Sequence, residues 1–204
     1  FAELVKLSLA TALDVDPSEF RVGRQAIAIP ACETEQVFLA DSLENGAGYA
    51  RWASEPAHME MAIRAFHASV EPKWAHSNHA GDCDRSCPDC LRNYGNRFSH
   101  GMLDWRLALD LADLVLGKHI KLERWLEGSE EPVIDSFLRI CKGAGMSVES
   151  DHSSEGLPIL SSGTRALVLG HPLWHTQNGL LQPQQMSARD ELRNIGIDPI
   201  FVDV

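Results

Sequence analysis

The chain has 204 residues, of which 44% are hydrophobic and 23% charged, and its formal net charge is −11. These values are typical of a soluble globular protein with one ordinary domain or two small ones. No apolar run approaches the roughly 20 residues that span a bilayer, and no secretory leader is visible, so we expect no membrane association. The first residue is not methionine, and we therefore expect the chain to be part of a longer polypeptide.

Charge is distributed unevenly along the sequence. Residues 73–124 hold eight of the eighteen basic residues and sum to +1, whereas residues 1–72 and 125–204 each sum to −6. A strongly acidic chain is poorly suited to bind nucleic acid over its whole surface, so any contact with phosphate is expected in the middle segment. The alternative is a solvated surface of mixed charges. The five unevenly spaced cysteines do not suit a secreted disulfide scaffold and favour a reducing cytoplasm.

The first elements in chain order are a helix and a hairpin. Residues 1–13 have the apolar spacing of a helix with one buried face, and Asp16-Pro17 favours a turn after it. Two runs rich in β-branched and aromatic residues, 20–30 and 35–42, predict strands that pair with each other. Gly46 and Gly48 follow, and they indicate either a tight turn or a bend that holds an anion at a helix start.

Two longer helices are predicted on either side of a cysteine-rich segment. The helix over residues 55–70 presents one apolar face, made of Met59, Ile63, Phe66 and Val70. The helix over residues 102–117 ends at Gly117. Its predicted apolar stripe consists of Leu103, Leu107, Leu111 and Leu114.

From about residue 118 the pattern changes to that of a small α/β unit. Residues 121–128 and 131–145 predict helices, and residues 151–163 a loop or hairpin. A buried strand over 166–174, a helix over 186–196 with Ser187 and Asp190 near its start, and a final strand over 197–204 complete the unit. The fold class is therefore α/β (mixed α+β): a helix/strand domain that contains the cysteine-rich segment, residues 1–117, followed by a small α/β unit, residues 118–204.

Three cysteines lie within eight positions in the middle segment. Cys87-x2-Cys90 allows two thiolates to converge on one ion from a tight turn, and Cys83 and His79 precede it in the pattern H-x3-C-x3-C-x2-C. Soft sulfur with one imidazole favours Zn²⁺ over hard cations. With four protein ligands no coordination position remains for water, so the spacing predicts a structural zinc at His79, Cys83, Cys87 and Cys90 and no catalytic residue.

Other interpretations of the cysteines remain open. The fourth ligand could be Cys32, His76 or His100 instead of His79. A redox C-x-x-C pair, an iron–sulfur cluster and a catalytic cysteine fit less well, because the third thiol is close by, a fourth cysteine is distant and no family signature of a nucleophile is present.

Two stretches carry a family resemblance. "FLADSLENGAGYARWA" and "CDRSCPDCLRNYGNRFSHGMLDWRLALDLA" resemble the MrfA-type zinc-binding (MZB) domain found at the C-terminus of certain DEAD/DEAH-box helicases and related anti-phage defence proteins. The resemblance covers about residues 1–117 and implies a helicase or translocase context, in DNA repair or anti-phage defence, with motor domains as partners. It also implies four cysteine ligands, from which a histidine at position 79 departs. The cluster looks closer to the defence-associated relatives.

The chain itself has no Walker A loop, so we expect a non-catalytic module that positions DNA or a partner beside a motor. Arg92, Arg97 and Arg106 are the candidate phosphate-binding residues. One alternative is an acidic protein-interaction adaptor that makes no contact with nucleic acid. Another is a metal-dependent nuclease domain, and its candidate acidic residues are Asp135, Glu149, Asp151 and Glu155.

Overall fold

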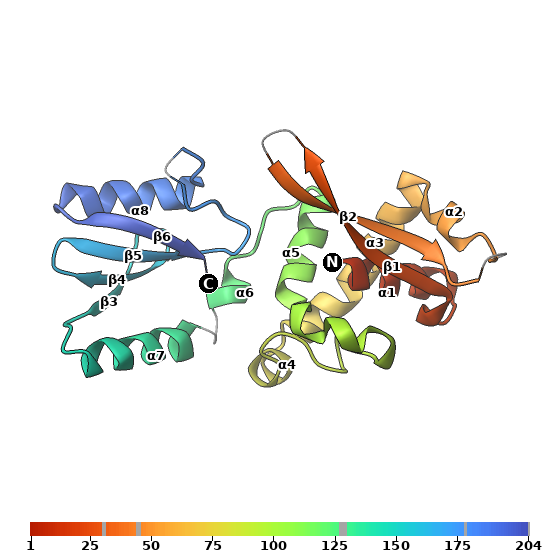
Figure 1. Cartoon of the computed structure of the whole chain (residues 1–204), viewed down its shortest axis with the longest axis horizontal. Helices are drawn as coiled ribbons and strands as arrows, with labels where there is room; N and C mark the ends of the chain where they lie inside the picture. Colours follow the sequence, from red (N-terminus) through yellow and green to blue (C-terminus); the bar gives the residue numbers. More distant parts are fainter. Residues whose placement is uncertain (30–31, 44–45, 127–129, 178, 204) are drawn as a thin grey trace. The chain divides into compact units, whose positions relative to one another are not determined.

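The computed structural model describes residues 1–29, 32–43, 46–126, 130–177 and 179–203. It divides into two compact units, Phe1–Arg124 and Trp125–Val204 (Figure 1). The division predicted from the sequence lies between residues 117 and 118. The first unit extends further because the side chain of Arg124 is buried among carboxylates of that unit. The mixed α/β fold class is confirmed.

Three helices build the core of the N-terminal unit. α1 (Ala2–Leu13) and α5 (Trp105–Val115) both contact α3 (Pro56–Trp74) (Figure 1). The predicted apolar face of α3 is confirmed, since Ile63 and Val70 are buried and Met59 and Phe66 pack against the same cluster. The helix continues one turn beyond the predicted end, through Pro72, and this brings Trp74 into the core.

The predicted hairpin forms from β1 (Phe20–Ile29) and β2 (Cys32–Asp41), which pair antiparallel, with the short 3₁₀ helix η1 (Pro17–Glu19) before it. The bend at Gly46 and Gly48 is a tight turn, and the anion bound at the following helix start is a side chain of the protein itself. The Asp41 carboxylate accepts hydrogen bonds from the amides of Gly48 (3.0 Å) and Ala50 (2.7 Å) at the start of α2 (Tyr49–Ala53). Gly48 has φ 82°, a conformation that side chains other than glycine rarely adopt.

Between α3 and α5 lie only short elements, α4 (Ser77–Asp82) and the 3₁₀ helix η2 (Tyr94–Met102). Asp104 caps α5 by accepting hydrogen bonds from the amides of Arg106 and Leu107. The predicted leucine stripe is not the buried face of this helix, because Leu114 is 46% exposed. The face that enters the core is one residue out of phase with that stripe and consists of Trp105, Ala108, Leu109 and Ala112.

The C-terminal unit is a four-stranded sheet with helices. The division between the units falls within α6 (Glu123–Leu126), and α7 (Glu130–Gly143) follows. The strands stand in the order β3 (Glu149–His152), β4 (Pro158–Ser162), β5 (Arg165–Gly170) and β6 (Asp198–Asp203). β3 and β4 as well as β4 and β5 pair antiparallel, whereas β5 and β6 are parallel. α8 (Pro183–Asn194) connects β5 and β6 and packs against both. The strand–helix–strand prediction is thereby confirmed, and residues 151–163 form the predicted hairpin instead of a loop.

α8 begins three residues before its predicted start, with Gln182 as N-cap and Gln185 completing a capping box, so Ser187 and Asp190 lie inside the helix. Ile134 of α7 packs against Leu160 and Leu169 of the sheet.

In the part of the chain that the structure describes, no helix is both long and apolar enough to cross a membrane.

Candidate metal centre

The structure brings the four predicted metal ligands together. The ligand atoms of His79, Cys83, Cys87 and Cys90 all lie within 4.8 Å of one another. His79 comes from α4, Cys83 is the residue that ends this helix, and the other two cysteines follow in the next turn. A short helix with His and Cys at i and i+4 therefore supplies one half of the site, and the C-x-x-C turn supplies the other.

The separations within the cluster fit a tetrahedral ion. The Sγ atom of Cys90 is 3.9 Å from that of Cys83 and 3.8 Å from that of Cys87, and the Nε2 atom of His79 is 3.4 Å from the Sγ atom of Cys87. A zinc ion with Zn–S bonds of about 2.3 Å holds tetrahedral sulfurs roughly 3.8 Å apart, and a nitrogen and a sulfur roughly 3.6 Å apart. Three thiols with one imidazole are also the donor set that zinc prefers.

The backbone around the C-x-x-C turn is organised about the sulfurs. The amide of Cys87 donates to the Sγ atom of Cys90 at 3.1 Å, and the carbonyl of Cys87 accepts from the amides of Cys90 (3.2 Å) and Arg92 (3.0 Å). These bonds close the turn and fix both thiols on the same side. They also place a backbone dipole against a sulfur, which favours its thiolate form.

His79 is oriented by a hydrogen bond on its far side. Its Nδ1 atom lies 2.8 Å from the carbonyl oxygen of Trp74, which can only accept, so Nδ1 carries the proton and donates. The lone pair of Nε2 is then directed toward Cys87 and available to an ion. A second partner that fixes the histidine tautomer is the usual environment of a metal-binding imidazole.

Burial explains why an ion is needed to keep these thiols ionised. Cys83 is 4% exposed, and burial together with the neighbouring thiols raises the pKa of its thiol well above the ordinary value. Burial also raises the pKa of Cys90, against the opposing effect of backbone hydrogen bonds. Without a cation the thiols of Cys83 and Cys90 would remain protonated, whereas a coordinated ion displaces their protons.

The start of α5 covers the metal cluster. The indole Nε1 of Trp105 donates to the carbonyl of Cys83 (3.1 Å), and the Trp105 amide donates to the carbonyl of Arg85 (2.8 Å). The guanidinium of Arg106 donates to the carbonyl of Asp84. Two residues of α5 thus donate hydrogen bonds to three successive carbonyls, those of residues 83–85, which lie outside regular helices and strands. Cys83 and Cys90 accordingly belong to the hydrophobic core of the unit.

The alternative fourth ligands have other positions. His76 caps α4 by accepting from the amide of Asn78, and the Nε2 atom of His100 lies 3.0 Å from the carbonyl oxygen of Asn93. The side chain of Cys32 lies outside the described residues. His79 is therefore the candidate that the geometry supports.

The three predicted phosphate-binding arginines differ in exposure. Arg92 is partly buried and its Nε donates to the hydroxyl of Ser86 at 3.0 Å. Arg97 is exposed. Arg106 is only 5% exposed, and its guanidinium is occupied by the carbonyls of Asp84 and Arg124. The role expected for Arg106 does not fit this burial, since a phosphate in solvent would have to displace the covering chain.

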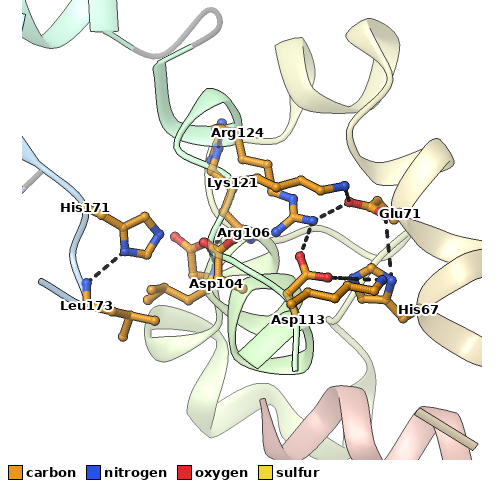
Figure 2. Close-up of polar contacts among 12 residues, drawn as sticks. His67, Glu71, Asp104, Arg106, Asp113, Lys121, Arg124, His171 and Leu173 are labelled. Carbon is orange, nitrogen blue, oxygen red and sulfur yellow. Dashed lines mark hydrogen bonds and ion pairs between the residues drawn. The ribbon is translucent and has the colours of Figure 1, made fainter. Parts of the chain in front are cut away.

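A second group of ionisable side chains lies between α3, α5 and α6. Ligand atoms of His67, Glu71 and Asp113 lie within 4.8 Å of one another. Figure 2 shows the carboxylates of Glu71 and Asp113 between the imidazole of His67 and the guanidinium of Arg124. Arg124 forms ion pairs with Glu71, Asp110 and Asp113, the last at 2.7 Å. Lys118 and Lys121 also bind Asp113 and Glu71. Three cations thus balance three carboxylates, so this cluster needs no metal and acts as a buried ion network.

The pKa values within this network follow from burial and pairing. Burial tends to raise the pKa of Glu71, but hydrogen bonds from Lys121 and Arg124 outweigh it and lower this pKa to about 2. Burial lowers the pKa of His67, although Asp113 and Glu71 oppose the effect. Sequence reasoning missed this network. Its only signal was the spacing of acidic residues on otherwise apolar helices, Asp110 and Asp113 on α5.

The residues of the nuclease interpretation do not converge. Among the described residues, Asp135, Glu149, Asp151 and Glu155 form no group close enough to hold a metal ion. Tryptophan rings can stack on unpaired bases, but Trp74, Trp105 and Trp125 are buried.

Comparison with known proteins agrees with the metal cluster. Residues 1–91 match the family model of the MrfA Zn-binding domain (MZB). Over 168 residues, 78% of this chain, the sequence is 27% identical to the Druantia protein DruE of Escherichia coli (strain UMEA 4076-1). The chain spans only 8% of the length of that relative. No solved structure matches. The zinc prediction is supported by the family match together with the His/Cys₃ cluster, and the resemblance to the MrfA Zn-binding (MZB) family is confirmed for residues 1–91.

Proposed function

We propose that the chain is a non-catalytic accessory module of a DEAD/DEAH-box helicase-like protein. A structural zinc held by His79, Cys83, Cys87 and Cys90 would keep its N-terminal unit in shape. The module would position DNA or a protein partner beside a motor, in anti-phage defence or DNA repair. The observation that carries the proposal is the closed His/Cys₃ cluster within a region that matches the MZB family.

The donor set favours a structural role over a catalytic one. Four protein ligands fill a tetrahedral site, whereas a catalytic zinc keeps one position for water or substrate. Zinc in such a site supplies positive charge and four bonds that together contribute on the order of 10 kcal/mol to folding. Neighbouring residues of the chain orient the ligands and fix the metal loop to the core. Trp74 orients His79, and Trp105 ties the metal loop to α5.

The helicase context comes from the family resemblance and the relative. MZB domains, by the resemblance, accompany helicase motors. The relative DruE is more than ten times longer than the region it shares with this chain, which leaves ample length for motor domains. The free thiols of Cys83, Cys87, Cys90 and Cys141 suit a cytoplasmic protein.

An adaptor that binds only proteins is the second candidate. It is favoured by the acidic balance of residues 1–72 and 125–204, each −6, which disfavours nucleic acid over most of the surface. Gel shifts with single-stranded and double-stranded DNA separate the two proposals. A cleavage assay with Mg²⁺ or Mn²⁺ tests the nuclease interpretation.

The decisive test uses the full-length protein that carries this chain. Cys87→Ser and Cys90→Ser, introduced together, should lower DNA unwinding and DNA-stimulated ATP hydrolysis while basal ATP hydrolysis persists. Cys141→Ser is the matched control, because this cysteine is also buried but belongs to α7 in the other unit. A full-length protein without helicase motor motifs, or unwinding that survives zinc loss, would contradict the proposal.

A further inference from the structure

Two aromatic side chains on η2 are unusually exposed. Phe98 is 86% and Tyr94 81% exposed, more than any other large hydrophobic side chain in the described residues. Aromatic rings normally bury most of their area, so a pair left in solvent on one short helix has no role in the core. The pair directly follows the metal-binding turn in sequence.

Arg97 lies against both rings. Its guanidinium carbon is 4.6 Å from the ring centroid of Tyr94 and 4.4 Å from that of Phe98. Such contacts hold the planar guanidinium in place without using most of its hydrogen-bond donors. The three side chains therefore form one exposed surface with two ring faces and a fixed positive charge, here called the aromatic platform (Tyr94, Arg97 and Phe98).

The backbone beneath the platform is fixed to the metal-binding turn. Asn93 and Asn96 cap η2 reciprocally, each side-chain oxygen accepting from the other residue's amide. Asn96 is 7% exposed, and its Nδ2 donates to the carbonyl of Leu91 at 2.8 Å. Leu91 is the residue after Cys90, so the position of the platform depends on the closed turn.

The local charge contrasts with that of the whole chain. Residues 90–103 contain no aspartate or glutamate, and their charged residues are Arg92 and Arg97. An anionic ligand can therefore reach the platform without opposing carboxylates on the same segment, although the chain carries a net charge of −11. Exposed rings and an anion-attracting guanidinium together suit a ligand with flat apolar faces joined by negative charges.

We propose that the aromatic platform binds unpaired bases of single-stranded nucleic acid. Tyr94 and Phe98 stack on successive bases, and Arg97 pairs with the intervening phosphate. Ring faces of bases are accessible only when the strand is unpaired, which favours a single strand over a duplex. The proposal deepens the accessory function above, because a module beside a helicase motor meets the strand that the motor has separated.

The experiment measures fluorescence anisotropy of labelled oligonucleotides with the zinc-loaded full chain. The probes are an oligo-dT strand, its RNA counterpart, an abasic strand of equal length and a duplex. Stacking requires bases, whereas charge attraction alone binds the abasic strand as well. We expect oligo-dT to bind more tightly than either the abasic strand or the duplex, and comparison with RNA shows whether the sugar matters.

Substitutions then identify the residues responsible. Tyr94→Ala and Phe98→Ala should each weaken oligo-dT binding about 5-fold or more and reduce the advantage over the abasic strand. Tyr94→Phe and Phe98→Tyr keep a ring and should retain binding. Arg97→Gln should weaken all strands and flatten the salt dependence. Ile140→Ala, which truncates a 70% exposed apolar side chain on α7, is the control.

Zinc content and melting temperature confirm that each variant is folded. Equal oligo-dT affinity in wild type and the Tyr94→Ala/Phe98→Ala variant, or equal binding of the abasic strand, overturns the platform. The accessory role would survive that result, since a module can act on a partner and is tested separately by unwinding. Binding to no nucleic acid at all overturns the platform and leaves the protein-binding adaptor.

Discussion

Replacing Arg124 by methionine is the sharpest test of the ion network. The side chain of Arg124 is 4% exposed and pairs with Glu71, Asp110 and Asp113, of which both aspartates are fully buried. Removing one partner of a buried ion pair costs about 3–5 kcal/mol, because the remaining charge lies unpaired in a poor solvent. Lys118 still reaches Asp113 at 3.3 Å, so we expect the lower end, about 3 kcal/mol, and a fall in Tm of roughly 10 °C.

The assay is thermal and urea unfolding of the zinc-loaded chain. Lys121→Met is the matched control, because Lys121 pairs with Glu71 from a side chain that is 48% exposed. Exposed pairs contribute about 1 kcal/mol or less. Equal effects of the two substitutions would refute the conclusion that Arg124 is the central cation of the network.

Lowering the pH should reduce the difference in Tm between the wild type and Arg124→Met. In the wild type the pKa of Glu71 is lowered to about 2 from its ordinary 4.5, so its stabilising effect is complete above about pH 4.5 and is lost as the pH falls toward 2. Without Arg124 the pKa of Glu71 rises. As the pH falls, Glu71 is therefore protonated earlier in the variant than in the wild type, and its unpaired charge is removed. Both proteins lose zinc in acid, so the quantity to compare is the difference in Tm between them. A difference that does not change over this range would contradict the account.

Three further predictions concern the metal loop and the tight turn. Cys87→Ser should lower zinc content and solubility, measured by elemental analysis and centrifugation, whereas Cys141→Ser should leave zinc unchanged; similar behaviour would remove Cys87 from the site. Trp105→Phe removes the donor to the carbonyl of Cys83 and should lower the free energy of unfolding by about 1–3 kcal/mol while zinc is retained; zinc loss would mean that Trp105 does more than satisfy this carbonyl. Gly48→Ala should cost about 1 kcal/mol because of its φ of 82°; an unchanged melting curve would argue against that conformation.

Much of the fold follows from local pattern. The helix at residues 1–13, the hairpin and the strand–helix–strand unit were predicted because apolar periodicity and β-branched runs are local signals. The metal cluster was predictable for the same reason, since its four ligands lie within twelve residues. A site whose ligands come from one short segment can be recognised before the fold is known.

The features that were missed depend on contacts distant in sequence. The buried face of α5 is set by Trp105, which the metal loop holds through two carbonyls some twenty residues earlier, and leucine spacing alone does not contain this information. Arg106 was expected on the surface, but it bridges Asp84 and Arg124. Conversely, Tyr94 and Phe98 resemble core residues by type, and only their exposure identifies them as a surface.

Zinc K-edge X-ray absorption of the purified full chain tests the central claim most directly. We expect one zinc per chain with three sulfur neighbours at about 2.3 Å and one nitrogen at about 2.0 Å. Four sulfur neighbours would mean that another cysteine, and not His79, is the fourth ligand. A protein without zinc would show that the cluster of three thiols and an imidazole is held together by packing alone.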